Sequence, residues 1–323
     1  MNILHLTHCT EWFQDHFDFV CKQLGHTGET QQISDFGLTA AKADVLWAAN
    51  ADYYNSFDAV FVSHLATLSR IFLQNDWKKP LFIWLCFRFD HFDPANSVDR
   101  EAYRKLIKQA RLKPNVKFFA ASEHDRLYTQ RTLGDFPVEI VPPFVYVNNE
   151  NKVKVPCENT FYLVNKHNEL LPTLFEKTSL KEKLTALGIP IYAHTWTAGA
   201  PDLRGVQGVI HVPYTYLTRG LMENLALENV YFLPDLNYMK QLMVQRGFFW
   251  DVHNSNPGET RLSEWYREDN KNLFVFFSSL EHLKEISNSS HLKEWIEDRK
   301  QNIRAFNQRH NVEAREKWGN IFQ

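Results

Sequence analysis

Several sequence signatures that quickly assign a function are missing from this chain of 323 residues. Its 4 cysteines show neither CxxC nor Cys/His spacing, which argues against zinc and against a disulfide framework. No GxGxxG follows the first apolar stretch, and no P-loop, no Ser/His/Asp nucleophile elbow and no acidic pair spaced for Mg²⁺ or Mn²⁺ occurs. We therefore expect neither a common NAD enzyme nor a P-loop NTPase, and no metal or bound cofactor.

Charge excess and long apolar runs are also absent. The net charge of −2 provides no basic field of the kind that drives nucleic-acid binding, so no nucleic-acid partner is expected. No run approaches the roughly 18–20 apolar residues that a membrane span requires. Residues 1–8 have a strand pattern rather than that of a signal peptide. These features predict a cytoplasmic protein without a transmembrane segment.

Aromatic residues and alternating apolar segments are what the chain has in abundance. Its 25 Phe, 12 Tyr and 9 Trp favour thick cores and leave rings available to stack on sugars or bases. Short β-branched and aromatic runs alternate with segments of helical period, which is typical of a parallel α/β sheet. In the first half the predicted strands are 2–7, 58–63, 80–86, 116–121 and 138–141, and the predicted helices are 11–24, 39–54, 66–74, 99–111 and 123–133.

A change of composition divides the chain. Residues 146–158 are rich in Asn and have no apolar period, so we place a linker there. We predict one domain at 1–148, a second at 159–304, and a last helical segment, 305–323, that crosses back to the first. The second domain has predicted strands at 160–164, 189–193, 209–213, 230–233 and 273–277, and predicted helices at 170–187, 221–227, 236–245, 262–267 and 290–318.

The stretch 209–234, VIHVPYTYLTRGLMENLALENVYFLP, organises the second domain as strand, turn, helix and strand. A helix that begins at the end of a parallel strand offers free N–H groups and a positive dipole end, where α/β proteins bind phosphate. Thr218, Arg219 and Gly220 open this helix, and Glu223 lies in its predicted first turn. With Gly220 as the N-cap, Glu223 would occupy the capping-box position, which is the purely structural alternative.

This stretch resembles a known family. Met222-Glu223-Asn224-Leu225-Ala226 and the following Val230-Tyr231-Phe232-Leu233-Pro234 are similar to the donor-site helix and strand of GT-B glycosyltransferases of the group 1 type. NILHLTH at the start and LSRIFLQN…KPLFIWLCFRFD further on resemble glycosyltransferase-like proteins of large DNA viruses. The resemblance implies two Rossmann-like domains facing across a cleft, with the donor nucleotide sugar in the second. Thr215 stands where the family often has a second acid, and Glu228-Asn229 stands where it usually has Gly.

The resemblance also implies roles for individual residues. Glu223 would bind the donor ribose, with Arg219, Thr218 and Gly220 beside the diphosphate. Lys166, after the first strand of the second domain, would neutralise the departing diphosphate, with Asn165 as a weaker companion. Trp196 lies in the loop where such enzymes hold the nucleobase. The alternatives are an exposed lysine and a tryptophan packed in the core.

In the first domain, three predicted strand ends carry polar residues. They are His8, His64, and the segment from Arg88 to Asp93. Ligands bind beyond the carboxyl ends of parallel strands, and an acceptor hydroxyl needs a base. Asp90 is the first candidate, with Asp93 or His64 as others. Asp93 could instead set a turn before Pro94, Arg88 and Asp90 could pair structurally, and a histidine after a strand is often scaffolding.

These observations predict a metal-independent glycosyltransferase, hexosyl- or deoxyhexosyltransferase in type (EC 2.4 class). It would move a sugar from a nucleoside-diphosphate sugar to a hydroxyl of a glycan or other acceptor, with the nucleotide sugar as substrate rather than cofactor. The alternative is a catalytically silent GT-B relative that binds a sugar or a protein partner, because a fold does not determine a function.

Overall fold

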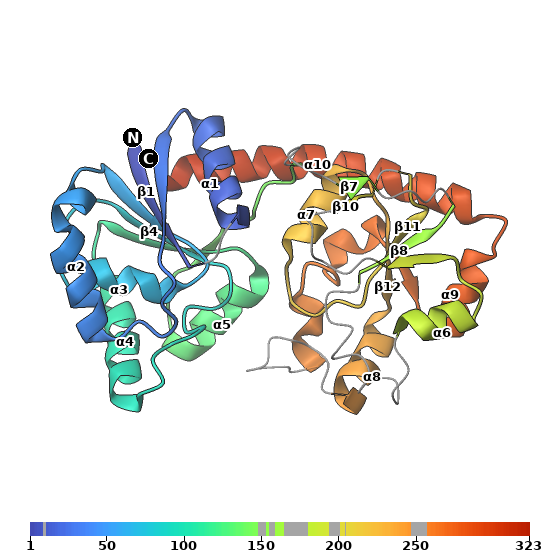
Figure 1. Ribbon diagram of the computed structural model, residues 1–323, viewed down its shortest axis with the longest axis horizontal. Helices are drawn as coiled ribbons and strands as arrows, with labels where there is room; N and C mark the ends of the chain where they lie inside the picture. Colours follow the sequence, from blue (N-terminus) through green and yellow to red (C-terminus); the bar gives the residue numbers. More distant parts are fainter. Residues whose placement is uncertain are drawn as a thin grey trace. The chain divides into compact units, whose positions relative to one another are not determined.

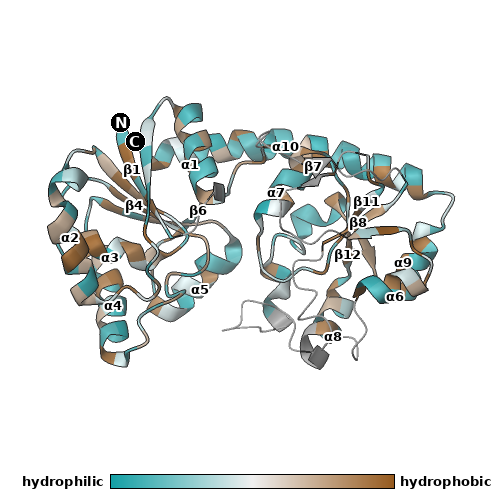
Figure 2. Ribbon diagram, viewed as in Figure 1, coloured by the Kyte–Doolittle hydropathy of each residue, from teal (hydrophilic) through white to brown (hydrophobic). Residues whose placement is uncertain are grey.

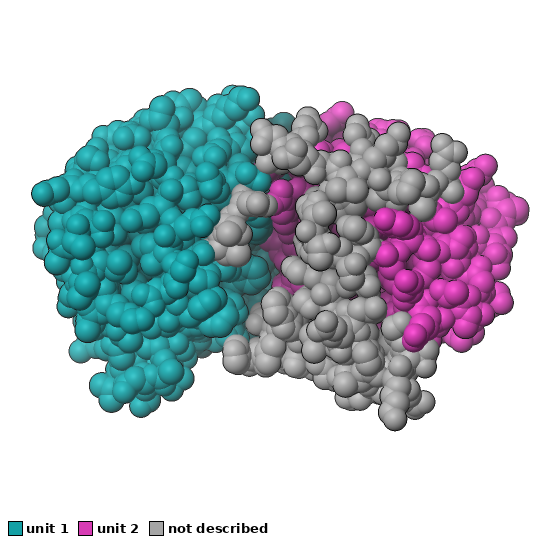
Figure 3. Space-filling view, viewed as in Figure 1, with its two compact units in different colours: residues 1–144, 311–323 teal, residues 145–310 magenta. Residues whose placement is uncertain are grey.

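The computed structural model describes residues 1–8, 11–147, 153–154, 159–164, 180–193, 201–203, 205–246 and 257–323. The chain separates into two compact units, shown in Figure 3: unit 1 comprises residues 1–144 and 311–323, and unit 2 comprises residues 145–310. Each unit is built on a parallel sheet (Figure 1). Across the described ranges, no helix is long and apolar enough to span a bilayer.

Unit 1 has a parallel sheet with the strand order β2-β1-β3-β4-β5-β6. Because the chain steps from β1 outward to β2 and then returns to β3, the strand order reverses between β1 and β3. The strands are β1 (Asn2–Thr7), β2 (Thr27–Gln32), β3 (Ala59–Val62), β4 (Leu81–Leu85), β5 (Val116–Ala120) and β6 (Glu139–Ile140). The helices are α1 (Glu11–Leu24), α2 (Ala40–Asn55), η1 (Ala66–Ser69), α3 (Arg70–Leu73), α4 (Ser97–Ala110) and α5 (Glu123–Leu133).

The two faces of this sheet have different cores, because successive side chains in a strand point to opposite faces. On one face the strand side chains are mostly aliphatic: Leu4, Val60 and Ile83 belong to a cluster with residues of α2, α3 and α4, some of them aromatic, and Figure 1 shows these helices along one side of the sheet. The other face is aromatic and includes Phe61 and Trp84, both buried.

Trp318 closes the aromatic face of unit 1. It belongs to α10 (Leu292–Ile321), a helix with residues in both units, and is fully buried. Its ring lies 5.1 Å from Trp84, 5.4 Å from Phe119 and 5.8 Å from Phe61, between centroids. Its indole N–H donates to the Pro142 carbonyl at 3.0 Å. The C-terminal turns of the chain therefore complete the core that the N-terminal strands begin.

Unit 2 has a parallel sheet of order β13-β12-β11-β8-β9, reversing between β8 and β11. Its strands are β8 (Phe161–Leu163), β9 (Ile191–Ala193), β11 (Gly208–Ile210), β12 (Tyr231–Pro234) and β13 (Val275–Phe277), and β7 (Val153–Lys154) pairs separately with β10 (Pro201–Asp202). Its helices are α6 (Leu180–Ala186), α7 (Arg219–Ala226), α8 (Leu236–Arg246), η3 (Pro257–Leu262), η4 (Glu268–Leu273) and α9 (Leu280–Ser287).

The structure corrects the predicted elements in several places, and the short strand β7 lies in the segment predicted as a linker because pairing with β10, also not predicted, forms it. Strand β2, TGETQQ, has no apolar residue and was not predicted, because an edge strand needs little burial. Helix α9 was also missed, although its Leu280, Leu283 and Ile286 are buried. The helix predicted at 262–267 is instead a turn between η3 and η4. In Figure 2 the apolar colouring gathers in the two sheets while α10 is largely hydrophilic, which explains why central strands were easy to predict.

Candidate functional site

Helix α7 begins earlier than predicted. Thr218 is its N-cap, with extended backbone (φ −134°), and its hydroxyl accepts the Leu221 N–H at 3.1 Å. Arg219 is the first helical residue, so Gly220 is not the cap. The physical reason is that a threonine hydroxyl satisfies an orphan N–H, which glycine cannot do. Glu223 therefore lies in the second turn of α7, and the capping-box alternative for it is wrong.

Glu223 and Arg219 are joined within α7. The guanidinium Nε donates to the Glu223 carboxylate at 2.7 Å, and the two side chains are 26% and 12% exposed for Arg219 and Glu223 respectively. An exposed pair at this spacing contributes only about 0.3–0.5 kcal/mol to helix stability. The pair thus holds a cation beside the helix start and a carboxylate one turn on, both within reach of solvent.

The first turn of α7 is fastened to strand β12. The Gly220 carbonyl accepts the Tyr231 hydroxyl at 2.9 Å and the Asn224 amide at 2.7 Å. Tyr231 is buried, and burial raises its phenol pKa well above its ordinary value, so the hydroxyl remains a donor. A Cβ at Gly220 would meet its nearest neighbour, the Thr218 hydroxyl, at 3.8 Å, which is ordinary contact. The space around Gly220 therefore does not require glycine.

The C-terminal end of α7 has a Schellman motif. The Glu228 N–H donates to Leu225 at 3.0 Å and the Asn229 N–H to Asn224 at 2.8 Å, both to carbonyls. The left-handed residue is Glu228, with φ 58°, in the Glu228-Asn229 pair that stands where the resembled family usually has Gly. Glu228 also pairs with Arg304 of α10 at 2.9 Å, a contact within unit 2.

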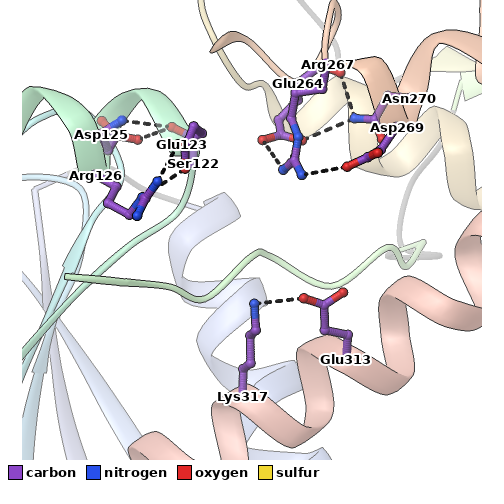
Figure 4. A network of polar contacts seen from close by, with 10 residues as sticks. All are labelled: Ser122, Glu123, Asp125, Arg126, Glu264, Arg267, Asp269, Asn270, Glu313 and Lys317. Atoms are coloured by element: carbon purple, nitrogen blue, oxygen red, sulfur yellow. Dashed lines mark hydrogen bonds and ion pairs between the residues drawn. The ribbon is translucent and has the colours of Figure 1, made fainter.

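A separate segment positions the loop that precedes α7. The Trp265 indole N–H donates to the Thr215 carbonyl at 3.0 Å, and the Glu264 N–H donates to Tyr216 at 2.9 Å. Figure 4 shows how Arg267 and Asn270 in turn bind the Glu264 carboxylate, at 3.3 Å and 3.2 Å. Sequence reasoning missed Glu264 and Trp265. Their segment holds this loop through the Glu264 backbone N–H and the Trp265 indole, while the Glu264 carboxylate binds Arg267 and Asn270.

In unit 1, the predicted polar residues at the strand ends do converge. The His8 and His64 ring centroids, beyond β1 and β3, lie 5.7 Å apart. Three residues here have left-handed backbone although none is glycine: His64 (φ 65°), Arg88 (φ 64°) and Phe92 (φ 54°). Such conformations cost about 1–3 kcal/mol each and cluster at functional sites.

Asp90 is engaged by three neighbours. One carboxylate oxygen accepts the Tyr128 hydroxyl at 2.6 Å and lies 3.3 Å from Arg104, and the other lies 3.4 Å from Nε of Arg88. The Arg88 and Asp90 side chains are each only 5% exposed, and Arg88 also lies over the Tyr128 ring at 4.5 Å. The structural ion pair, the alternative for these two residues, is therefore present.

The backbone of Arg88 is held from helix α5. Its N–H donates to the Asp125 carboxylate at 2.8 Å. The same carboxylate accepts the Ser122 hydroxyl at 2.6 Å, and Ser122 caps α5 by accepting the Asp125 N–H, an arrangement visible in Figure 4. These bonds stabilise the left-handed conformation that points Arg88 at Asp90.

The other two candidate bases are less enclosed. Asp93 is 15% exposed and lies 3.4 Å from Arg104. Its pKa is raised, first by burial and then by the charge of Asp90. Burial, followed by the nearby His8 and His91, lowers the pKa of His64 to about 3, so its imidazole is neutral at physiological pH and weakly basic. The pKa of Asp93 is thus displaced toward the range a base requires, whereas that of His64 is displaced away from it.

Three predicted donor-site residues, Asn165, Lys166 and Trp196, lie outside the described residues. Among the residues that the structure describes, no group of three or more His, Cys, Asp or Glu side chains is arranged to hold a metal ion.

Comparison with known proteins places the fold. No family model matches the chain, and no curated protein is similar to it in sequence. A glycosyltransferase from Rickettsia africae is similar in structure, with a TM-score of 0.59 and 10% identity, over 100% of this chain and 98% of that one. HepE of Anabaena, solved with UDP and glucose, has a TM-score of 0.56 and 9% identity over 100% and 99%. The chain therefore has an α/β fold of the kind found in these glycosyltransferases.

Proposed function

We propose that the protein is a GT-B glycosyltransferase that moves a sugar from a nucleoside-diphosphate sugar to a hydroxyl acceptor, without a metal. The observation that carries this proposal is the construction of the β11–α7–β12 segment in a chain with a glycosyltransferase fold. There a capped helix start lies beyond a parallel strand, with a cation and a carboxylate on its partly exposed side. The HepE neighbour, with bound UDP and glucose, supports a nucleotide sugar as donor.

In this mechanism unit 2 binds the donor. The N–H groups at the start of α7 and Arg219 stabilise the diphosphate as it leaves, since preorganised donors act most strongly where charge develops. Glu223 orients Arg219 through their 2.7 Å contact and accepts ribose hydroxyls with its remaining capacity. Lys166 and Asn165 would add donors to the diphosphate, and Trp196 would stack on the base.

Unit 1 supplies the acceptor site in this proposal. Asp93, with its raised pKa, removes the proton of the acceptor hydroxyl. The buried ion pair of Arg88 and Asp90 acts as a positioning pair, and His64 provides a neutral hydrogen-bonding ring. We also propose that the donor site and the acceptor site face each other across a cleft.

The decisive experiment compares the nucleotide affinity of variants at two glutamates: Glu223, which lies in α7, and Glu228, which follows the end of α7. Glu223→Gln should raise the Kd for nucleoside diphosphates about tenfold, because a charge-assisted hydrogen bond is lost. Glu228→Gln, which changes a glutamate paired with Arg304 at the other end of the helix, is the matched control and should leave the Kd unchanged. Calorimetric titration with UDP, GDP, ADP and TDP measures both.

Donor hydrolysis in the absence of acceptor then separates the two candidate functions. An enzyme releases sugar from the nucleotide that it binds, and loses this activity with Glu223→Gln. Nucleotide binding with neither donor hydrolysis nor transfer to any acceptor would contradict the proposed enzyme and favour the catalytically silent relative. No nucleotide binding at all would contradict both the donor site and the role of α7.

A further inference from the structure

Six aromatic rings form a closed series of contacts at the carboxyl edge of the unit 1 sheet. Successive ring centroids lie 3.8, 4.4, 4.3, 5.7, 5.3 and 5.7 Å apart around the series. The members, which we call the ring circuit, are three histidines and three phenylalanines: His8, Phe36, Phe92, His91, Phe87 and His64, the last of which returns to His8.

The ring circuit lies at the topological switch point of unit 1. His8 directly follows β1 and His64 follows β3 by two residues, and it is between these two strands that the order of the sheet reverses. In open parallel sheets, ligands bind outside the carboxyl ends of the strands at this point. The position therefore favours a binding surface over a packing contact.

The circuit is buried on one side and open on the other. Phe13, only 5% exposed, stacks under His64 at 4.9 Å, whereas Phe36 and Phe92 are 55% and 45% exposed. Gly37 follows Phe36 and has left-handed backbone (φ 65°), which a residue with a side chain rarely adopts, and it lies beside the Asp93 carbonyl next to Phe92. Phe92 itself has left-handed backbone, which is unusual for so large a residue. Two exposed phenyl rings are thus held together by local backbone constraints.

The histidines add hydrogen-bonding groups to these apolar faces. His8 Nδ1 lies 3.0 Å from the Ile33 carbonyl, which only accepts, so in the neutral ring Nδ1 carries the proton and Nε2 is an acceptor. Burial and its histidine neighbours keep the His64 ring neutral, with a pKa lowered to about 3. The surface therefore combines phenyl faces with imidazole nitrogens that can carry hydrogen bonds, and the His64 ring among them is uncharged.

We propose that the ring circuit binds an uncharged pyranose ring of the acceptor, with its C–H face on Phe36 and Phe92 and its hydroxyls on the imidazoles. This inference rests on the proposed function and names its acceptor as a neutral glycan. A lipid chain would cover the imidazole nitrogens without replacing their hydrogen bonds, which is costly. An anionic acceptor would need a cation here, and Arg88 and Arg104 are paired with Asp90 instead.

The test uses the full chain and a panel of methyl hexopyranosides and their disaccharides. Saturation-transfer NMR detects the bound sugar, and imidazole carbon–proton spectra report His8, His64 and His91. We expect these imidazole signals to shift on binding, and Phe36→Ala or Phe92→Ala to weaken the affinity about five- to tenfold, as the loss of one ring contact implies. Phe36→Tyr should retain binding, because it keeps the ring.

Trp295 offers a matched control. It is a 40% exposed ring 6.2 Å from His291, in α10 within unit 2, and it is outside the ring circuit. Trp295→Ala should leave sugar binding unchanged. Equal losses in Phe36→Ala and Trp295→Ala, or imidazole shifts with geranyl phosphate or tetramethylammonium but with no sugar, would overturn the inference.

The failure of this inference can be told apart from failure of the proposed function. Suppose that the protein hydrolyses its donor and transfers sugar, but the acceptor KM is unchanged in Phe36→Ala and Phe92→Ala. That result would overturn sugar binding by the ring circuit and leave the proposed function standing. A protein that neither binds nor hydrolyses nucleotide sugars, yet binds pyranosides through these phenylalanines, overturns the glycosyltransferase and supports the binding surface.

Discussion

The polar residues that follow the central strands differ in kind between the two units. In unit 1, Arg88 and Asp90 follow β4 and are almost entirely buried, each held by side chains of neighbouring helices. In unit 2, Arg219 and Glu223 follow β11, contact each other and remain partly exposed. The comparison teaches that charged pairs that follow a strand in these units differ in burial, and that only the pair in unit 2 leaves both side chains partly open to solvent.

Histidines sharpen the same contrast. His5 and His16 are fully buried in unit 1; the His5 nitrogens contact the Ser63 and Thr30 hydroxyls at 2.7 and 3.0 Å, and His16 Nε2 accepts the Phe144 N–H at 3.1 Å. The Ser63–His5 contact resembles part of a catalytic dyad, but Ser63 is 1% exposed and His5 is 0%. Ser63 and His5 are therefore parts of the core, and the uncharged state of the buried histidines His5 and His16 contributes to the free energy of unfolding.

Acid should give the largest effect, and should affect unit 1 first. Burial lowers the pKa of His5, His16, His64 and His124 to about 3, against 6.5 in the unfolded chain. Because the unfolded state binds more protons below pH 6.5, the stability is complete above 6.5 and falls as the pH drops toward 3. At pH 4.5 each histidine should cost roughly 3 kcal/mol, so that four approach the whole stability of a domain.

Hydrogen exchange at pH 7 and pH 5, read by peptide, measures this difference. Peptides of unit 1 should lose protection well before those of unit 2. His16→Gln, whose side-chain oxygen can still accept the Phe144 N–H, should reduce the proton uptake on unfolding by about one. Equal loss of protection in both units would show that these four histidines do not govern acid stability.

Changing a carboxylate to an amide in each unit should give the next largest effect. Asp90→Asn leaves the buried Arg88 charge without its partner, and should destabilise unit 1 by about 3–5 kcal/mol. Glu223→Gln breaks a partly exposed pair and should cost only about 0.5 kcal/mol. Urea unfolding measures both variants.

Turnover of the same variants tests the earlier candidate base. If Asp90 were the base, Asp90→Asn would reduce turnover by roughly 10²–10⁴-fold with little change in stability. If Asp93 is the base, Asp93→Asn should show that loss of turnover instead. A stable and inactive Asp90→Asn would therefore reverse the assignment of Asp90 to the scaffold.

Removal of metal ions with a chelator should leave the activity unchanged, which makes it the smallest of the expected effects. The carboxylates of Asp90 and Asp93 face Arg104, and Asp90 also faces Arg88 and Tyr128, so their negative charge is already balanced by protein groups. Sugar transfer should continue in excess EDTA. Loss of activity with EDTA and its recovery with Mn²⁺ would contradict the metal-independent mechanism and the structural reading of the unit 1 carboxylates.

Much of the secondary structure could be predicted, because it depends on local pattern. Helix α1 has the predicted bounds Glu11–Leu24, and the central strands β3, β4 and β5 were found within one or two residues, since their runs are apolar throughout. The same reasoning missed β2, whose polar residues form a strand only because β1 pairs with it from Asn2↔Thr27 to Thr7↔Gln32. Where a strand forms because it pairs with a neighbour and not because its side chains are buried, the amino-acid composition of the segment does not predict the strand.

The sequence by itself determined that two parallel α/β sheets would form, and that His8, His64 and the 88–93 segment would meet at one edge, because parallel strands align their carboxyl ends. Only the tertiary structure decided what those residues do there. It buried Asp90 against Arg88 and Tyr128, left Asp93 more accessible, and joined Phe36 to Phe92 beside the histidines. The positions of most strands along the chain depend on local patterns, whereas strand order, burial and partner choice depend on residues far apart in the chain.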